Sequence, residues 1–395
     1  MNLQEFQQIK VFCHEMINEM INRKSQITIM CLLLLSFGMK AQLNNSTLET
    51  FQHLDSTKSQ QLSFKFESFS YIKNNEYFLK IADGYTLFGN IFSPKMVFQP
   101  APNVQIEAGI FARKDFGNTA FTSVQPIFTV KIQQDSSQFL FGNLEGQLNH
   151  HLIEPMMNPE RVILNRQEYG LQYTKRKKNT FFDSWIDWQK MIYNGSNFKE
   201  QIFAGFSWNK KLITRPNFYL SIPLQLTFQH YGGQTTTDTG QVITNINTAI
   251  GMEAEWRMTG FLQKIRAQNY FVGYRQNSNY HPFFPDGSGV YLNLTAETKF
   301  INVMLSYWNS TGYISDAGGD LYQSVGRTFD YGKVVERYRN ILIIRAMKDW
   351  KIIDNLYLTF RFEPYFDLNN RVFEHSESLF LTYRQGFGLG IIKTK

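Results

Sequence analysis

An acidic and aromatic string at residues 181–189 carries the most distinctive chemistry of this 395-residue sequence. Successive side chains of a strand point to opposite faces, so Asp183, Trp185 and Asp187 would share one face. A tryptophan flanked by carboxylates suits sugar binding, because a sugar ring stacks on the indole while its hydroxyls pair with the carboxylates. The interpretation that we prefer is that Trp185 and Trp188 belong to an interfacial aromatic belt.

Two histidine-containing segments offer the residue types of metal binding and hydrolysis. His150 and His151 precede Glu154 and could bind zinc, but adjacent side chains point apart and an H-E-x-x-H spacing is absent. Segment 374–377 reads Glu-His-Ser-Glu, yet neighbouring residues alternate sides in a strand, and we expect a loop here. We therefore expect a polar loop at 146–167, no metal, no cofactor and no enzymatic activity.

Period-two alternation of apolar and polar residues recurs in segments of about ten residues from Tyr85 to Ile391. Segments 220–228, 290–300 and 356–366 show it most clearly. Strands of about ten residues are long enough to cross a bilayer at a tilt, whereas strands of a soluble sandwich are usually shorter. The pattern predicts an all-β fold, a single closed antiparallel transmembrane β-barrel.

We expect about sixteen strands, with fourteen or eighteen still open. The segments are 62–72, 84–98, 103–114, 120–132, 138–145, 168–176, 180–189, 199–209, 216–228, 244–257, 263–276, 288–299, 302–309, 337–347, 355–366 and 377–391. Short and long connectors alternate between them, as periplasmic turns and extracellular loops do in such barrels. Prolines within these segments, such as Pro94, Pro223 and Pro364, are expected at bulges or near a rim.

The polar faces of the strands are expected to line a lumen that is narrowed by the inward loop 146–167. The predicted substrate-binding residues of that lining are Asp183, Trp185, Asp187, Glu253, Glu255, Arg257, Arg361 and Glu363. Because both signs of charge are present, we expect only weak ion selectivity.

The amino terminus has the features of a secretory signal peptide. Positive residues at 22–24 precede an apolar stretch at 27–38, which is too short to span a membrane as a helix. We expect cleavage after Ala41, and both cysteines fall within this leader. The predicted organisation is an extension and removed signal peptide at 1–41, a periplasmic tail at 42–61 and a transmembrane barrel at 62–395.

The composition is also typical of a barrel. Aromatic residues make up 16% of the chain, while the mean hydropathy is only −0.32. After the leader no run of about 18 apolar residues occurs, so a helical membrane protein is excluded. The net charge of +7 is spread along the chain. The basic run 175–178 lies between two expected strands, so we interpret it as a solvated turn and expect no nucleic-acid partner.

Four features resemble porin-like outer-membrane barrels of Gram-negative bacteria: the leader ending at 40–42, the glycine-bounded segments 84–89 and 142–146, and the Trp185/Trp188 string. The resemblance implies export to the outer membrane, with outer-membrane lipid and the barrel-insertion machinery as partners. One departure is that the chain ends Ile-Ile-Lys-Thr-Lys rather than on an aromatic residue.

The function expected from these features is a porin-like channel for passive diffusion of small polar solutes, among them sugars or oligosaccharides. Two alternatives remain open. One is a secreted or surface-attached β-sandwich that binds glycans, and the other is an outer-membrane barrel enzyme that modifies lipid. Substituting Leu224 by arginine separates the first two, and substituting Ser376 tests the enzyme.

Overall fold

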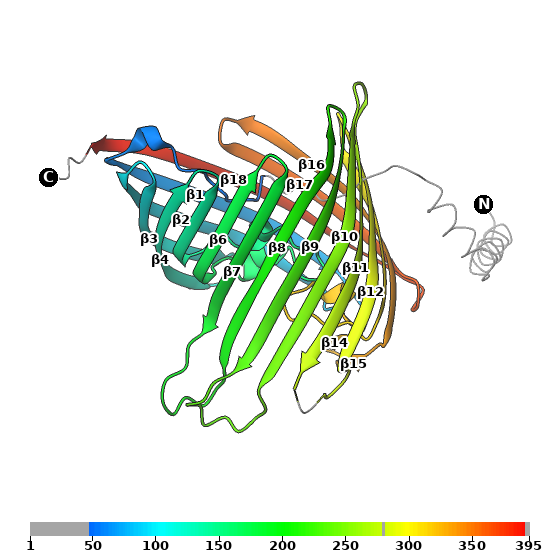
Figure 1. Cartoon of the computed structure of the whole chain (residues 1–395). Coiled ribbons are helices and arrows are strands. Elements are labelled where there is room, and N and C mark those ends of the chain that lie inside the picture. The colour runs from blue at the N-terminus through cyan, green and yellow to red at the C-terminus, as the bar shows by residue number, and fades with distance from the viewer. Residues whose placement is uncertain (1–46, 279–280, 392–395) are drawn as a thin grey trace. The chain divides into compact units, whose positions relative to one another are not determined.

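The computed structural model describes residues 47–278 and 281–391. Within these ranges, sixteen antiparallel strands form a closed barrel, in which β1 (Gln61–Glu76) pairs with β18 (Val372–Ile391) (Figure 1). The other wall strands are β2 (Tyr85–Ala101), β3 (Val104–Asp115), β4 (Ser123–Gln134), β5 (Ser137–Asn143), β6 (Tyr169–Lys177), β7 (Thr180–Lys190), β8 (Glu200–Arg215), β9 (Phe218–Gly232), β10 (Ile243–Arg257), β11 (Leu262–Asn277), β12 (Asp286–Thr298), β13 (Asn302–Thr311), β16 (Tyr338–Ile353) and β17 (Leu356–Asp367). The predicted fold class is therefore confirmed.

The links between strands differ in length at the two ends of the barrel. One end has short turns, such as 102–103 and 178–179, while the other carries the long segments 144–168 and 312–337 (Figure 1). Outer-membrane barrels have short periplasmic turns and longer extracellular loops, and by this correspondence we call the second end the extracellular end and the first the periplasmic end. The expected signal peptide and cleavage site lie outside the described residues.

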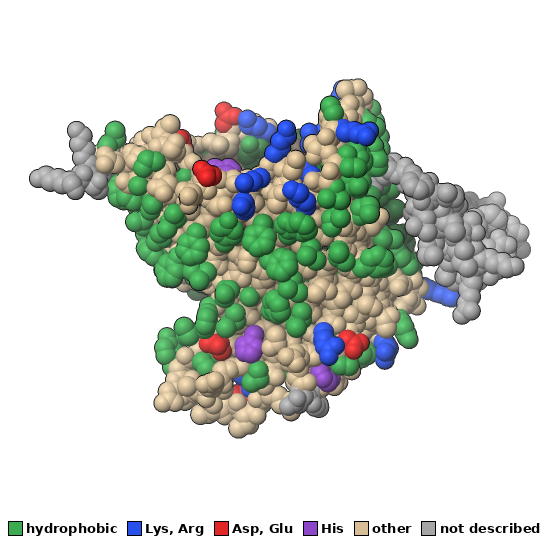
Figure 2. All heavy atoms as spheres, viewed as in Figure 1, with side chains coloured by type: hydrophobic (Ala, Val, Ile, Leu, Met, Phe, Trp, Pro, Cys, Tyr) green, Lys and Arg blue, Asp and Glu red, His purple; other side chains and the backbone are tan. Residues whose placement is uncertain are grey.

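The outer surface is apolar where the strands cross the membrane. A broad band of hydrophobic side chains crosses the visible face in Figure 2, with most of the visible lysine and arginine side chains above it and several below it. Phe128, Ile250 and Phe271 are examples of exposed outward residues. In the described part of the chain, no helix is long and apolar enough to span a bilayer.

The prolines within the strands do not lie at β-bulges, which was one of the two placements that we expected. Pairing is interrupted on one side of Pro94, Pro223 and Pro364, but no register shift accompanies the interruption. A proline lacks the N–H group that would extend the ladder on that side. The strand therefore tolerates the missing hydrogen bond without a bulge.

Three segments fill the lumen. The segment before β1 contains η1 (Ser56–Lys58), loop 144–168 contains η2 (Gln147–His150) and α3 (Arg161–Leu164), and loop 312–337 contains η3 (Asp320–Tyr322), β14 (Val325–Thr328) and β15 (Gly332–Val335). Asn149 accepts hydrogen bonds from the backbone of Thr50 and Phe51, both at 3.0 Å. The described part of the expected periplasmic tail thus contacts a loop inside the barrel.

A hydrophobic core lies inside the barrel rather than between layers. Inward residues of the wall, such as Trp308 and Ile341, pack against Met156, Tyr313 and Tyr322 of the two long loops. The residues of this core are almost fully buried. Loop 146–167 therefore lies inside the lumen, as the sequence analysis expected, and packs there tightly.

Candidate functional site

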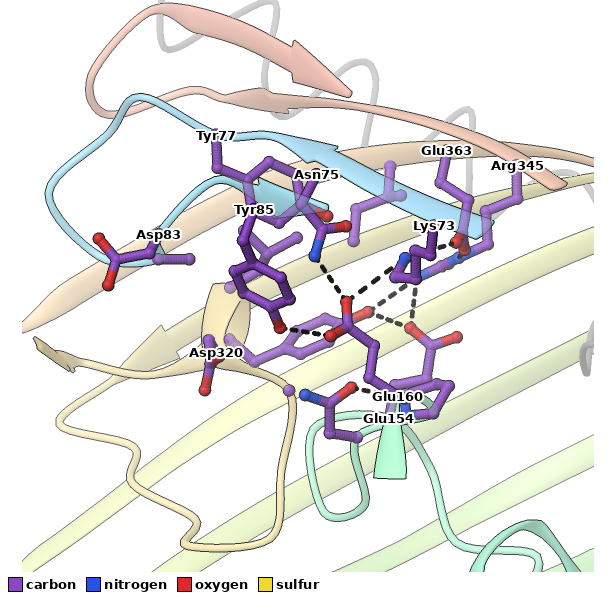
Figure 3. A pocket seen from close by; sticks show the side chains of 17 residues that line it. Lys73, Asn75, Tyr77, Asp83, Tyr85, Glu154, Glu160, Asp320, Arg345 and Glu363 are labelled. Atoms are coloured by element: carbon purple, nitrogen blue, oxygen red, sulfur yellow. Dashed lines mark hydrogen bonds and ion pairs between the residues drawn. The ribbon is translucent and has the colours of Figure 1, made fainter. Parts of the chain in front are cut away.

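A pocket opens between the barrel wall and the inward loops, near the extracellular ends of the strands (Figure 3). The wall contributes side chains from β1, β2, β16 and β17, and the loops contribute residues from 77–83, 154–160 and 319–322. Its free volume of about 70 Å³ holds a few water molecules or one functional group of a larger ligand.

Glu160 occupies the centre of the pocket (Figure 3). One carboxylate oxygen accepts a hydrogen bond from Asn75 Nδ2 at 2.8 Å and lies 3.4 Å from the ammonium group of Lys73. The other oxygen accepts a hydrogen bond from the Tyr85 hydroxyl. Glu160 precedes α3, and its own backbone N–H donates to Asn158 Oδ1 at 2.9 Å. Strands β1 and β2 and the loop 144–168 therefore fix its position together.

Arg345 of β16 forms the second charged centre. Its Nε donates to Glu363 at 2.7 Å, and its Nη2 donates to Glu154 and, at 2.9 Å, to the Tyr322 hydroxyl. Tyr322 in turn donates to the same Glu154 oxygen at 2.5 Å. Arg345 Nη1 donates to Ser306 Oγ at 2.8 Å. Arg345 is buried, so these partners compensate a charge that has lost most of its water.

Two hydrogen-bond acceptors at the pocket receive no hydrogen bond. Within the described residues, Glu154 Oε1 and Asn75 Oδ1 are buried without a hydrogen-bond partner. Buried polar atoms normally have a partner, so each unsatisfied atom at a cavity marks a place where water or ligand binds. Glu154 therefore has one oxygen anchored by Arg345 and Tyr322 and the other available to the pocket.

Lys73 connects the pocket to Ser376 on β18. The ammonium group donates to Ser376 Oγ at 3.0 Å and lies 3.8 Å from Glu363. Segment 374–377, which we expected to be a loop, is part of β18. Ser376 faces inward and is fully buried, while His375 faces outward.

Asp320 lines the pocket from η3 and reaches solvent. Desolvation and the nearby carboxylates of Glu160 and Asp83 raise the pKa of Asp320 to about 6. Its carboxyl group thus changes charge close to neutral pH, which is a property of groups that bind or transfer protons.

The predicted residues of segment 181–189 form a different, closed cluster. The buried His150 ring places Nδ1 2.6 Å from Asp183 and Nε2 2.8 Å from Glu168. It stacks on Trp185 with ring centroids 3.6 Å apart. Burial lowers the pKa of His150, but the two carboxylates outweigh burial and raise it to about 9. His150 therefore anchors loop 144–168 to β7.

The aromatic-belt interpretation of this segment is wrong for Trp185. Trp188 faces outward and is exposed, as a belt residue would be, whereas Trp185 faces inward and is buried. Asp187 is also inward and accepts a hydrogen bond from the backbone of Tyr169 at 2.8 Å. His150 covers one face of the Trp185 indole.

The remaining predicted site residues do not form one site. Glu253 and Glu255 are buried together on β10, where the Tyr219 hydroxyl bonds both at 2.7 and 3.2 Å. Arg257 lies at the periplasmic end of β10, with 65% of its side chain exposed, and pairs with Glu255 at 2.9 Å. Arg361 of β17 is buried beside the Phe380 ring.

Only Glu363 of the predicted residues lines the pocket. The sequence analysis did not select Lys73, Glu160 and Arg345. Lys73 falls just beyond the strand expected at 62–72, and β16 is apolar on both faces around Arg345. The sequence feature that did point to the pocket was Glu154, which lies in the segment that contains His150 and His151.

Among the described residues, no cluster of three or more His, Cys, Asp or Glu is arranged to hold a metal.

Solved structures of outer-membrane proteins are similar in fold. A loop L8 deletion mutant of OmpT from Vibrio cholerae has a TM-score of 0.50 at 8% identity and covers 82% of this chain and 99% of its own. OprD from Pseudomonas aeruginosa has a TM-score of 0.48 at 9% identity and covers 89% of this chain and 98% of its own. The chain thus has the closed-barrel fold of the OmpT structure, and the expected resemblance to porin-like barrels is confirmed. A search of curated proteins found no match.

Residues 54–392, which include every residue of the pocket, match the family model described as lipid A 3'-O-deacylase-type. This description names an enzyme, so the expectation that the chain has no enzymatic activity is wrong. The expectation rested on the lack of a nucleophile, base and acid close together in the sequence, whereas a barrel can bring such groups together from distant segments. The chain belongs to the lipid A 3'-O-deacylase-type family.

Proposed function

We propose that this protein hydrolyses an acyl ester of a lipid A-type glycolipid in the outer membrane, with the lumen pocket as its active site. The family match supports the reaction class. The observation that carries the assignment to this pocket is Glu154, whose one oxygen is anchored by Arg345 and Tyr322 while the other has no partner among the described residues. Such a carboxylate is held in place and can accept a proton.

The reaction needs only water as second substrate. Water attacks the ester carbonyl carbon and gives a proton to Glu154 Oε1. The bond between the acyl carbon and the sugar oxygen then breaks, and Glu154 returns the proton to that oxygen. The products are a free fatty acid and a sugar hydroxyl. The ammonium group of Lys73 supplies positive charge to stabilise the developing oxyanion.

A covalent route through Ser376 is less consistent with the contacts. A serine nucleophile needs a neighbouring base that removes its proton. Lys73 instead donates to Ser376 and lies near the carboxylates of Glu160 and Glu363. Because Lys73 Nζ donates to Ser376 Oγ, it does not accept the proton of that hydroxyl in this arrangement. Water activated by Glu154 is therefore the nucleophile of the proposal.

Passive diffusion of small polar solutes, which the sequence analysis expected, is the weaker candidate. Segments 47–60, 144–168 and 312–337 lie in the lumen, and their apolar residues pack against the wall. The pocket offers only about 70 Å³. Ester hydrolysis requires room for the reacting group alone, whereas diffusion requires a continuous water-filled path.

The test is acyl release from lipid A by the purified barrel in detergent micelles, followed by mass spectrometry. Glu154→Gln should lower kcat by a factor of about 100 or more, because the amide cannot accept the proton. Glu253→Gln is the matched control, since Glu253 is also a buried lumen carboxylate but does not line the pocket. Unchanged release by Glu154→Gln, or no release by the unaltered protein, would contradict the proposal.

A further inference from the structure

Five polar side chains form a cluster on the outside of the barrel, which we call the outer cluster. Asn74 is its centre and donates to Glu76 at 2.6 Å and to Glu377 at 2.9 Å. It accepts a hydrogen bond from the Thr86 hydroxyl at 2.7 Å. His375 Nδ1 lies 2.9 Å from the other oxygen of Glu377. The cluster spans the neighbouring strands β1, β2 and β18.

The outer cluster lies within the apolar surface and not beyond its edge. Toward the extracellular rim, Phe366 and Phe373 are exposed, and their ring centroids are 4.9 Å apart. Toward the middle of the barrel, Ile72, Phe88 and Phe362 are exposed. Charged groups on a lipid-facing surface are costly, by an amount that falls toward the interface. A lipid partner that supplies hydrogen bonds would compensate that cost.

The outer cluster is separated from the pocket by the thickness of one strand. In β18, His375 and Glu377 face outward, while Ser376 between them faces inward and bonds Lys73. In β1, Asn74 faces outward, while Asn75 lines the pocket. The outer cluster and the pocket therefore lie on opposite faces of the same part of the wall.

We propose that the outer cluster binds the polar junction of an outer-leaflet glycolipid and holds this lipid against the outer face of the wall that carries the pocket on its inner face. The recognised chemistry is the set of hydroxyl and amide groups that join the sugar to its acyl chains. The carboxylates of Glu76 and Glu377 accept hydrogen bonds from such groups, and the His375 imidazole and the Thr86 hydroxyl can also bind them. This inference rests on the proposed function for the identity of the lipid.

The experiment measures binding of fluorescently labelled lipid A to the purified full barrel in dodecylmaltoside micelles by fluorescence anisotropy. The double variant His375→Phe/Glu377→Leu removes the charged pair and keeps the surface apolar. Asn74→Leu is a second variant, in case the first does not fold. His230→Phe is the control, because His230 also faces outward near the extracellular end of a strand but bonds only Thr244 among the described residues. Folding is checked by mobility with and without boiling.

We expect the Kd for lipid A to rise about tenfold in the double variant and in Asn74→Leu, which corresponds to the loss of one or two net hydrogen bonds. The control should keep the original Kd. Equal binding by all variants, or no binding by the unaltered protein, would overturn the inference. Glu154→Gln should bind normally without hydrolysis, so weakened binding in the outer-cluster variants supports the inference even if no acyl release is ever found.

Discussion

Arg345 of β16 and Glu154 of loop 144–168 form a largely buried ion pair although 191 residues separate them in the sequence. The pair fastens the loop to the barrel wall and, at the same time, orients the carboxylate that we propose as the base. Stability of the loop and chemistry of the pocket therefore depend on the same contact.

Replacing Arg345 by methionine should destabilise the barrel by about 3–5 kcal/mol, because Glu154 and Glu363 would remain largely shielded from water after losing the guanidinium group. The measurement is the free energy of unfolding in guanidinium chloride with detergent micelles. Arg257→Met is the control, because 65% of its side chain is exposed, and it should change stability by less than about 1 kcal/mol. Equal stabilities of the two variants would show that the ion pair between Arg345 and Glu154 does not stabilise the barrel.

His150 should make the stability of the barrel depend on pH. Its pKa is raised from 6.5 to about 9 in the folded protein. The resulting stabilisation is fully present below pH 6.5, is lost as pH rises through 9, and amounts to a few kcal/mol. His150→Gln cannot be protonated, so its deficit relative to the unaltered protein should be large at pH 6 and small at pH 10. A deficit that is the same at both values would show that His150 is neutral when folded.

Asp320 should weaken the binding of a negatively charged substrate as pH rises through about 6. Its raised pKa means that the carboxyl group is largely neutral below this value and ionised above it. Ionisation adds negative charge beside Glu160 and Asp83. We expect the KM of the unaltered protein to increase between pH 5 and pH 7, whereas Asp320→Asn should have a flat KM. An equally steep increase in Asp320→Asn would assign the effect to another group.

Leu224 lies near the middle of β9 and faces outward. Leu224→Arg should cost about 2–4 kcal/mol, because a charged side chain would enter the hydrocarbon region. His230→Arg, near the extracellular end of the same strand, should cost no more than about 1 kcal/mol. The change in the free energy of unfolding of each variant is to be measured in lipid vesicles. A larger cost at residue 230 would mean that the membrane boundary lies elsewhere along β9.

The barrel itself could be predicted from local patterns. Alternation in segments such as 220–228 and 356–366 fixes which residues face inward, because the side-chain period of a strand is two. Counting the alternating segments predicted about sixteen strands, and the alternation of long and short links supported this number. The expected strand ends were less accurate, and for this reason the expected strands 62–72 and 377–391 did not include Lys73 and Ser376, which lie in β1 and β18.

The candidate site could not be predicted in the same way. Glu363 was identified because it lies on the polar face of a regular strand, but its partners Lys73 and Arg345 come from other strands. Glu154 and Glu160 enter through a loop, which has no periodicity to place them. The cluster of His150 with Asp183 and Trp185 likewise depends on how that loop folds inward.

The sequence by itself therefore determined the barrel, the ends at which its long and short links lie and the polar character of its inner face, because these follow from side-chain alternation and link length along one segment at a time. Only the tertiary structure decided that the lumen is filled, that Arg345 meets Glu154 and that Lys73 meets Ser376. These contacts join distant segments across the interior, where packing and charge compensation, and not local pattern, select the partners.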